Sequence, residues 1–261
     1  PLAELEQLTE ASDPVNSASY EPKQGRYIVF ERASGGNEVD QLYRLEDKKE
    51  PVLLTNPDER HSMVGWLNKS SHLLYTSVPV DRTAQGGSRA QVSTSLWLMD
   101  PEKPEGRRKL AELPGGGWFG GSPSHDDKQL AITRYLSANE AQIWLLDLSS
   151  GATRQLLPAP DSKEAKAVYF PGDFSRDGKH LWLTSDRFGE FRELLRMDLA
   201  SGALSRVSAH IPWDVSGATT TEDGRRLAAQ FNVDGRDELR FFDTATLKEL
   251  PAPKLPAGNV G

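Results

Sequence analysis

Ser175-Arg176-Asp177-Gly178-Lys179, followed by His180-Leu181-Trp182-Leu183-Thr184, is the stretch that decides the fold. The first half favours a tight turn, because Asp hydrogen-bonds nearby backbone groups and Gly tolerates turn geometry. The second half is a short apolar run of the kind found in strands. A polar stretch at 185–192, a second apolar segment at 193–199 and the turn Ala200-Ser201-Gly202 complete the phrase.

The same phrase of turn, strand, hairpin and strand occurs five times. The copies open at residues 23, 68, 125, 175 and 222, so they recur every 45 to 57 residues. That period is typical of four-stranded propeller blades. The sequence therefore predicts an all-β fold, a β-propeller of four-stranded antiparallel blades, with about five complete blades plus partial blades at both ends.

Each copy supplies two apolar strands, which suit sheets buried between neighbouring sheets. The first strands are predicted at Tyr27–Phe30, Leu73–Thr76, Leu130–Thr133, Leu181–Thr184 and Leu227–Gln230. The second strands are predicted at Gln41–Leu45, Ser95–Met99, Gln142–Leu146, Leu194–Met197 and Leu239–Phe242. Four of the second strands end in an acidic residue that suits a turn: Asp100, Asp147, Asp198 and Asp243. A shorter, more polar strand follows and is expected at the water-facing rim.

The expected blades cover approximately 19–55, 62–113, 115–158, 167–208 and 213–251. Residues 6–9 and 256–261 match parts of further blades. Because a broken ring exposes two sheet edges, we expect the chain to be part of a longer protein. A stand-alone five-bladed ring is the alternative.

Composition excludes several classes of function. The 261 residues include 31 basic and 38 acidic ones, a net charge of −7, which argues against a general nucleic-acid-binding surface. There is no cysteine, so disulfides and thiolate chemistry are excluded and the redox compartment stays open. No apolar run reaches the roughly 20 residues that span a bilayer.

Motifs for catalysis are missing from the chain. The nearest approach to a Gly-x-Ser-x-Gly nucleophile elbow, Gly120-Gly121-Ser122-Pro123-Ser124, lacks the last glycine. The histidines are scattered, and His72 and His180 precede strands at equivalent repeat positions, which indicates a structural role. Asn232–Glu238 has calcium-loop residue types at the wrong spacing and is expected to be a hairpin tip. We expect no catalytic residue, no metal site and no cofactor.

Four residues are the candidates for substrate contact. A polar insertion at 80–95 carries Arg82 and Arg89, and such insertions project from one face of a repeat protein. Glu38 and Glu140 follow Asn37 and Asn139 in two hairpins, where their carboxylates could meet a peptide amine. The alternatives are a surface hairpin for the insertion and simple turns for the Asn-Glu pairs, with Asn accommodating positive φ.

Several segments resemble bacterial prolyl oligopeptidase-type serine peptidases of the dipeptidyl or acylaminoacyl peptidase kind. They are Ile28–Arg32, Gly35–Glu38, Gln41–Leu45, Ser137–Glu140, Leu199–Gly202 and Ala209–Val215. The more discriminating are His210-Ile211-Pro212-Trp213-Asp214-Val215 and Gly35-Gly36-Asn37-Glu38, since Asp-Gly-Lys turns are common to many propellers, including TolB-like ones. The resemblance covers nearly the whole chain.

The resemblance implies that this propeller caps a separate α/β-hydrolase domain of the same protein, which holds the catalytic triad. The propeller would admit short peptide substrates and exclude folded proteins, and it would itself be non-catalytic. Two other readings stay open. One is a TolB-like scaffold that binds a protein partner. The other is an enzyme of the lactonase or sialidase kind, for which the required ligands or carboxylates are not found.

Overall fold

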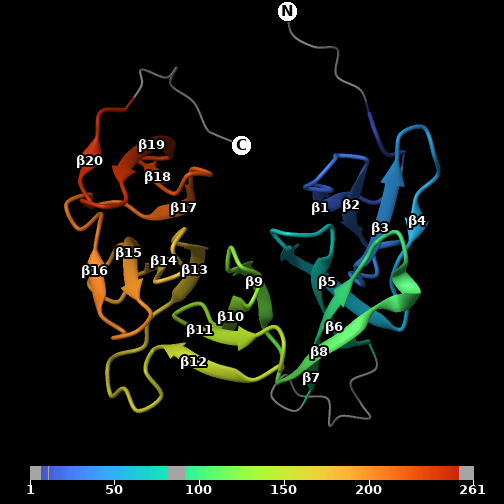
Figure 1. Ribbon diagram of the computed structural model, residues 1–261, viewed down its shortest axis with the longest axis horizontal. Coiled ribbons are helices and arrows are strands. Elements are labelled where there is room, and N and C mark those ends of the chain that lie inside the picture. Colours follow the sequence, from blue (N-terminus) through green and yellow to red (C-terminus); the bar gives the residue numbers. More distant parts are fainter. Residues whose placement is uncertain (1–6, 11, 81–91, 253–261) are drawn as a thin grey trace, which may run out of the picture. The chain divides into compact units, whose positions relative to one another are not determined.

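The computed structural model describes residues 7–10, 12–80 and 92–252, and the fold is all-β. Five four-stranded antiparallel sheets follow one another along the chain and form the blades of a β-propeller (Figure 1). Among the described residues the one helix that is assigned is a single 3-10 turn, η2 (Pro104–Gly106). The predicted fold class is confirmed.

Within every blade, strands adjacent in sequence are adjacent in the sheet. The first blade contains β1 (Val15–Tyr20), β2 (Tyr27–Arg32), β3 (Gln41–Glu46) and β4 (Val52–Leu53). The second contains β5 (Glu59–Trp66), β6 (Leu73–Pro79), β7 (Ser93–Met99) and β8 (Arg108–Pro114). The third contains β9 (Trp118–Pro123), β10 (Gln129–Ser137), β11 (Glu140–Asp147) and β12 (Thr153–Leu157). The fourth contains β13 (Tyr169–Phe174), β14 (His180–Ser185), β15 (Glu193–Asp198) and β16 (Leu204–Arg206). The fifth contains β17 (Val215–Thr220), β18 (Arg226–Val233), β19 (Arg236–Asp243) and β20 (Glu249–Leu250).

The chain divides into two compact units, which we describe separately. Unit 1 comprises Pro1–Trp66 and Ser70–Gly115 and holds the first two blades. Its core forms where one face of β2 and β3 meets the second blade. The buried residues of that core are Tyr27, Val29, Leu42, Leu54, Leu73, Tyr75 and Met99. Alternation along β2 therefore decides which side chains hold the two blades together.

Unit 2 comprises Leu67–Lys69 and Gly116–Gly261 and holds the other three blades. Its blades pack face to face through two apolar clusters. One joins the third and fourth blades and includes Ile143, Tyr169 and Leu183. The other joins the fourth and fifth blades and includes Trp182 and Phe231. These clusters are the cores that the apolar repeat predicts.

The opening turn of the repeat is built by one recurring set of hydrogen bonds. Ser175 Oγ donates to Asp177 Oδ1 at 2.6 Å and accepts from His180 N at 2.9 Å. Ser124 and Thr221 make the matching bonds to Asp126 and Asp223 at 2.7 and 2.6 Å. A short polar side chain thus satisfies backbone donors that the turn would leave unpaired.

Asp127 departs from this pattern, because it stands where the other turns have Gly178 and Gly224. Its φ of 59° lies in the left-handed region that costs most side chains about 1–2 kcal/mol. Its carboxylate accepts hydrogen bonds from Asn68 N at 2.7 Å and Lys69 N at 2.8 Å, within unit 2. The strained residue therefore caps a neighbouring turn.

We expect Asp127→Gly to lower the free energy of unfolding by about 1 kcal/mol. Bonds to a charged acceptor outweigh the relief of backbone strain. The matched control is Lys48→Gly in unit 1, since exposed Lys48 has a φ of 55° and caps nothing in the described chain. That variant should be neutral or stabilising by up to about 1 kcal/mol. Urea denaturation of both variants checks the sign, and a stabilising Asp127→Gly would contradict the capping role.

The repeat did not predict the first strand of each blade: β1, β5, β9, β13 and β17. These strands carry little apolar alternation and include turn residues; β9 reads Trp-Phe-Gly-Gly-Ser-Pro. Gly120 and Gly121 have positive φ and lie at a bulge in the β9–β10 pairing. Of the predicted partial blades, residues 7–10 form no strand here and 256–261 lie outside the described residues. Their pairing with further blades stays a prediction.

Candidate functional site

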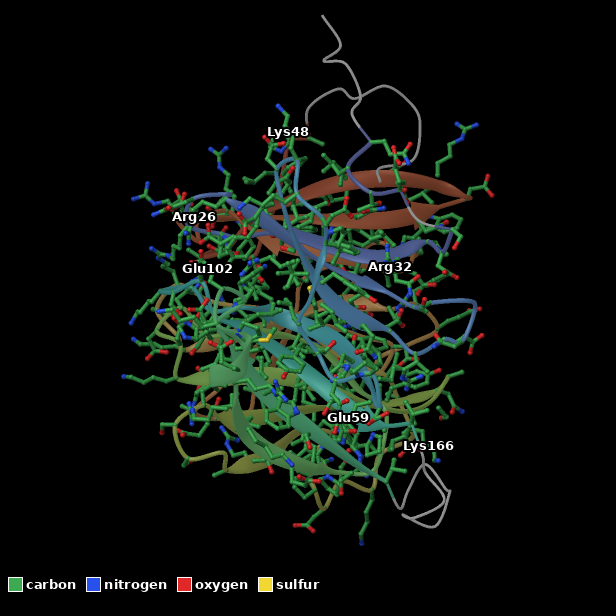
Figure 2. All side chains as sticks on the ribbon, turned by 90° about the vertical axis from the view of Figure 1, so that its right-hand side faces the viewer. Arg26, Arg32, Lys48, Glu59, Glu102 and Lys166 are labelled. Carbon is green, nitrogen blue, oxygen red and sulfur yellow. The ribbon has the colours of Figure 1, made fainter. Side chains whose placement is uncertain are left out.

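Each blade has two chemically different ends. At the turn end the first and third strands lead into the Asp-containing turns. At the hairpin end lie the connection between the second and third strands and the linker to the next blade. Figure 2 shows this for unit 1, where Arg26 and Glu102 lie on the left and Arg32 on the right. Two of the four candidate residues, Glu38 and Glu140, are described by the structure, and both lie at this end of their blades.

Glu38 lies in the exposed turn between β2 and β3 and has a φ of 56°. The prediction that Asn37 adopts positive φ is wrong. Asn37 instead accepts from Ser34 N at 3.3 Å and Val39 N at 3.0 Å through its Oδ1. Positive φ falls on Glu38 and on two glycines, Gly35 and Gly36. No ion pair of Glu38 is found among the described residues, so its carboxylate faces solvent.

Glu140 opens β11 and is half-buried. It forms an ion pair of 2.5 Å with Lys166, which belongs to the linker before the fourth blade. Asn139 before it has no positive φ either, and it accepts from Ser137 Oγ at 2.7 Å. A peptide amine at Glu140 would have to compete with Lys166. Arg82 and Arg89 lie outside the described residues, and their substrate contact stays a prediction.

The hairpin end of unit 2 carries an aromatic ring between two guanidinium groups. Exposed Phe188 lies 5.2 Å from Arg187 and 5.0 Å from Arg206, measured from ring centroid to guanidinium carbon. Arg187 pairs with Glu164, and Arg206 forms a two-pronged contact with Glu193. Both charges are therefore already satisfied, which favours a structural role for this cluster.

Two aspartates at the same end accept hydrogen bonds from the main chain and so hold the connections in place. Asp186 Oδ1 accepts from Val168 N at 2.8 Å, and Asp214 Oδ1 accepts from Arg192 N at 2.7 Å. Asp214 belongs to the His210–Val215 segment that carried the family resemblance. Each bond ties a linker residue to the hairpin of the fourth blade, so the segment positions the hairpin end.

The turn end of unit 2 has a shallow cavity of about 570 Å³ lined by both signs of charge. Its acidic residues are occupied by their own turns. Hydroxyl and backbone donors from Ser149 and Ser150 lower the pKa of Asp147 to about 2. Asp126 and Asp177 are held by Ser124 and Ser175 in the same way. The cavity is thus formed by turn architecture.

The chemistry of a nucleophile is not found in the described chain. Ser122 lies within strand β9, and its Oγ is 3.4 Å from Asp173 Oδ1, far from the strand-to-helix geometry of a nucleophile elbow. No group of three His, Cys, Asp or Glu residues that could hold a metal occurs among the described residues. His125 is half-buried, and its Nε2 lies 3.2 Å from Phe174 O.

Sequence reasoning missed three buried His or Glu residues in unit 1: Glu21, Glu31 and His61. His61 is 3% exposed, and burial lowers its pKa to about 4 although Glu59 opposes the shift. Glu31 is 8% exposed, burial raises its pKa, and it accepts a hydrogen bond from Met63 N. A polar residue inside the apolar strand at 27–32 was the one available signal for Glu31.

The five four-stranded antiparallel sheets define the class of protein as a β-propeller domain. At its hairpin ends, the described polar residues mainly hold the connections in place. No protein-family model matches the chain, and no curated protein matches it. Structural similarity is extensive. A prolyl endopeptidase structure described for its inter-domain dynamics shares 14% identity over 95% of this chain and 36% of its own, with a TM-score of 0.69.

Two other solved structures show how widely the fold is shared. TolB from Acinetobacter baumannii is 20% identical over 80% of this chain and 47% of its own, with a TM-score of 0.56. An oligogalacturonate lyase in complex with manganese is 13% identical over 94% of this chain and 66% of its own, with a TM-score of 0.68. At these identities the fold is what is shared. The chain spans less than half the length of the endopeptidase and of TolB.

Among the described residues, no helix is long and apolar enough to serve as a membrane span.

Proposed function

We propose that this chain is the non-catalytic propeller domain of a prolyl oligopeptidase-type serine peptidase and that it gates the access of short peptides to a separate α/β-hydrolase domain. One observation carries the proposal: 95% of this chain matches a prolyl endopeptidase while spanning only 36% of that enzyme. The remainder of such an enzyme has room for a domain with the nucleophile that the described residues lack.

The hairpin ends fit a gating surface. Hydrogen bonds from backbone N–H groups to Asp186 and Asp214 hold the connections there in place. The ion pair between Glu140 and Lys166 does the same for the linker before the fourth blade. A rigid rim selects by size, because a folded domain cannot enter where an extended peptide of a few residues can. Exposed Glu38 offers a carboxylate to a peptide amine, which is the contact predicted from the sequence.

The test is to express the complete reading frame that encodes this chain. We expect it to contain a Gly-x-Ser-x-Gly motif followed by Asp and His, and we expect a fluorophosphonate probe to label it. Residues 1–261 expressed alone should remain unlabelled. The complete protein should cleave a short peptide at least about a hundredfold faster than the same sequence placed in a folded protein.

Equal cleavage of the peptide and the folded protein would contradict gating. A reading frame without a nucleophile motif would instead favour the second candidate, a TolB-like scaffold that binds a protein partner. The similarity to TolB supports that candidate, since its 20% identity is the highest of the three similarities given above. Affinity capture with the whole protein would then identify the partner.

A further inference from the structure

Arg134 is a half-buried arginine in the third blade, and its charge has no acidic partner among the residues that the structure describes. It lies near the hairpin end of β10, opposite Trp118 on β9 and Gln142 on β11. Its guanidinium carbon is 5.4 Å from the ring centroid of Trp118. Among the described residues it makes no ion pair, and its Nε is buried without a hydrogen-bond partner.

Such an arrangement is costly unless something compensates for it. A buried polar nitrogen without a partner costs about 1–3 kcal/mol. Within the described part of the chain, burial is what shifts the pKa of Arg134, and it lowers that pKa from its ordinary value. The group nevertheless stays charged, because an arginine does not lose its proton in proteins. Stacking on Trp118 offsets part of the cost but supplies no hydrogen-bond acceptor.

Three other arginines near the hairpin ends differ from Arg134 because an acidic residue lies close to each. Arg187 and Arg206 are paired with Glu164 and Glu193. Arg32 stands at the same register position in the first blade, at the end of β2, and stacks on Tyr43 at 4.7 Å. Arg32, however, has an acidic residue nearby: hydrogen bonds from Gly35 N and Gly36 N lower the pKa of Asp13, and the charge of Arg32 adds to that shift. Arg134 is therefore the strongest candidate for an external anion.

The surroundings of Arg134 suit a planar carboxylate. Trp118 and Trp144 meet edge to face at 5.5 Å and form an apolar wall that keeps the guanidinium oriented. Gln142 accepts from Trp144 Nε1 through its Oε1 at 2.9 Å, which fixes the side-chain amide and leaves its NH₂ group as a second donor. A guanidinium fork beside an amide donor matches the geometry of a carboxylate.

We propose that Arg134, together with Gln142, binds the C-terminal carboxylate of a short peptide. The proposal deepens the proposed function, because it names a feature of the peptides that the gate admits. An acidic side chain within a peptide presents the same chemistry, so the experiment includes both sources.

The test measures binding of three peptides to residues 1–261 by isothermal titration calorimetry. They are Ala-Ala-Phe, its C-terminal amide, and Ala-Glu-Phe amide. We expect the free acid to bind at least about tenfold more tightly than the amide, since a bidentate charged contact is lost in the amide. Tighter binding of Ala-Glu-Phe amide than of Ala-Ala-Phe amide would show that a side-chain carboxylate also serves as ligand.

Two variants of Arg134 and one matched control show whether the preference for the free acid depends on Arg134. Arg134→Gln should abolish the preference for the free acid, and Arg134→Lys should restore only part of it, because a lysine lacks the fork. Arg154→Gln removes an exposed arginine from β12 of the same blade and should leave the preference unchanged. Thermal melts should show that all three variants are folded.

Equal binding of acid and amide, an unchanged preference in Arg134→Gln, or no binding of the free acid at millimolar concentration would each overturn the proposal. None of these results bears on the hydrolase domain, because probe labelling of the complete reading frame does not depend on Arg134. If the complete protein were labelled by the probe but residues 1–261 bound acid and amide equally, this inference would be refuted and the proposed function would be unaffected.

Discussion

Phe231→Ala is expected to lower the free energy of unfolding of unit 2 by about 3–5 kcal/mol. Phe231 is fully buried in β18 and belongs to the cluster that joins the fourth and fifth blades, together with Trp182 and Leu194. Truncation removes apolar contacts and leaves a cavity that the neighbouring strands can fill only in part. Urea denaturation followed by circular dichroism measures the loss.

The control for this prediction is the same substitution at an exposed position of unit 2. Phe119 is 41% exposed in β9 and contacts Tyr135 at 6.1 Å between ring centroids. Phe119→Ala should cost no more than about 1 kcal/mol. If the two variants lost similar stability, the packing between the fourth and fifth blades would not be the core described above.

His61→Phe is expected to remove a pH-dependent loss of stability in unit 1. The pKa of His61 falls to about 4 because of burial, so the folded chain resists protonation where the unfolded chain, with a pKa near 6.5, accepts it. Stability from this residue is therefore complete above pH 6.5 and falls as the pH falls to about 4. The loss amounts to about 3 kcal/mol at about 1.4 kcal/mol per pH unit.

The measurement is the difference in unfolding free energy between His61→Phe and the unsubstituted chain from pH 8 to pH 4. Phe fits the site because His61 contacts the Tyr75 ring at 5.8 Å. The unfolding free energy of His61→Phe should increase relative to that of the unsubstituted chain as the pH falls below 6.5. Met63→Leu, in the same core and without a titrating group, should give a flat difference. A flat curve for His61→Phe would show that the folded protein accepts the proton.

The difference curve is needed because other carboxyl groups of unit 1 also titrate in acid. Bonds from Ser71 and from backbone donors at residues 23 and 24 lower the pKa of Glu21 to about 2. Its stabilising effect is therefore lost only below pH 4.5. Burial raises the pKa of Glu31, so that residue destabilises the fold as the pH rises above 4.5. Both contributions cancel in the comparison with the variant.

The structure describes two of the four candidate residues, Glu38 and Glu140, and their contact with a substrate stays a prediction. Glu38 and Glu140 do lie at hairpin ends, as the repeat implies. Their environments differ, because Lys166 pairs with Glu140 from a linker 26 residues away, whereas Glu38 stays exposed. The sequence does not single out Arg134, because a charged residue near the end of an apolar strand is ordinarily expected to be exposed to solvent. Only the side-chain contacts show that it lacks an acidic partner.

By itself, the sequence determined the repeat, the turns and the second and third strands of every blade. These features depend on local chemistry, since a Ser-x-Asp-Gly turn and an apolar run form contacts within a few residues of themselves. Tertiary structure decided the rest. The first strands, the capping by Asp127, the neutral His61 and the unpaired Arg134 all arise from residues distant in sequence, whose contacts no local pattern encodes.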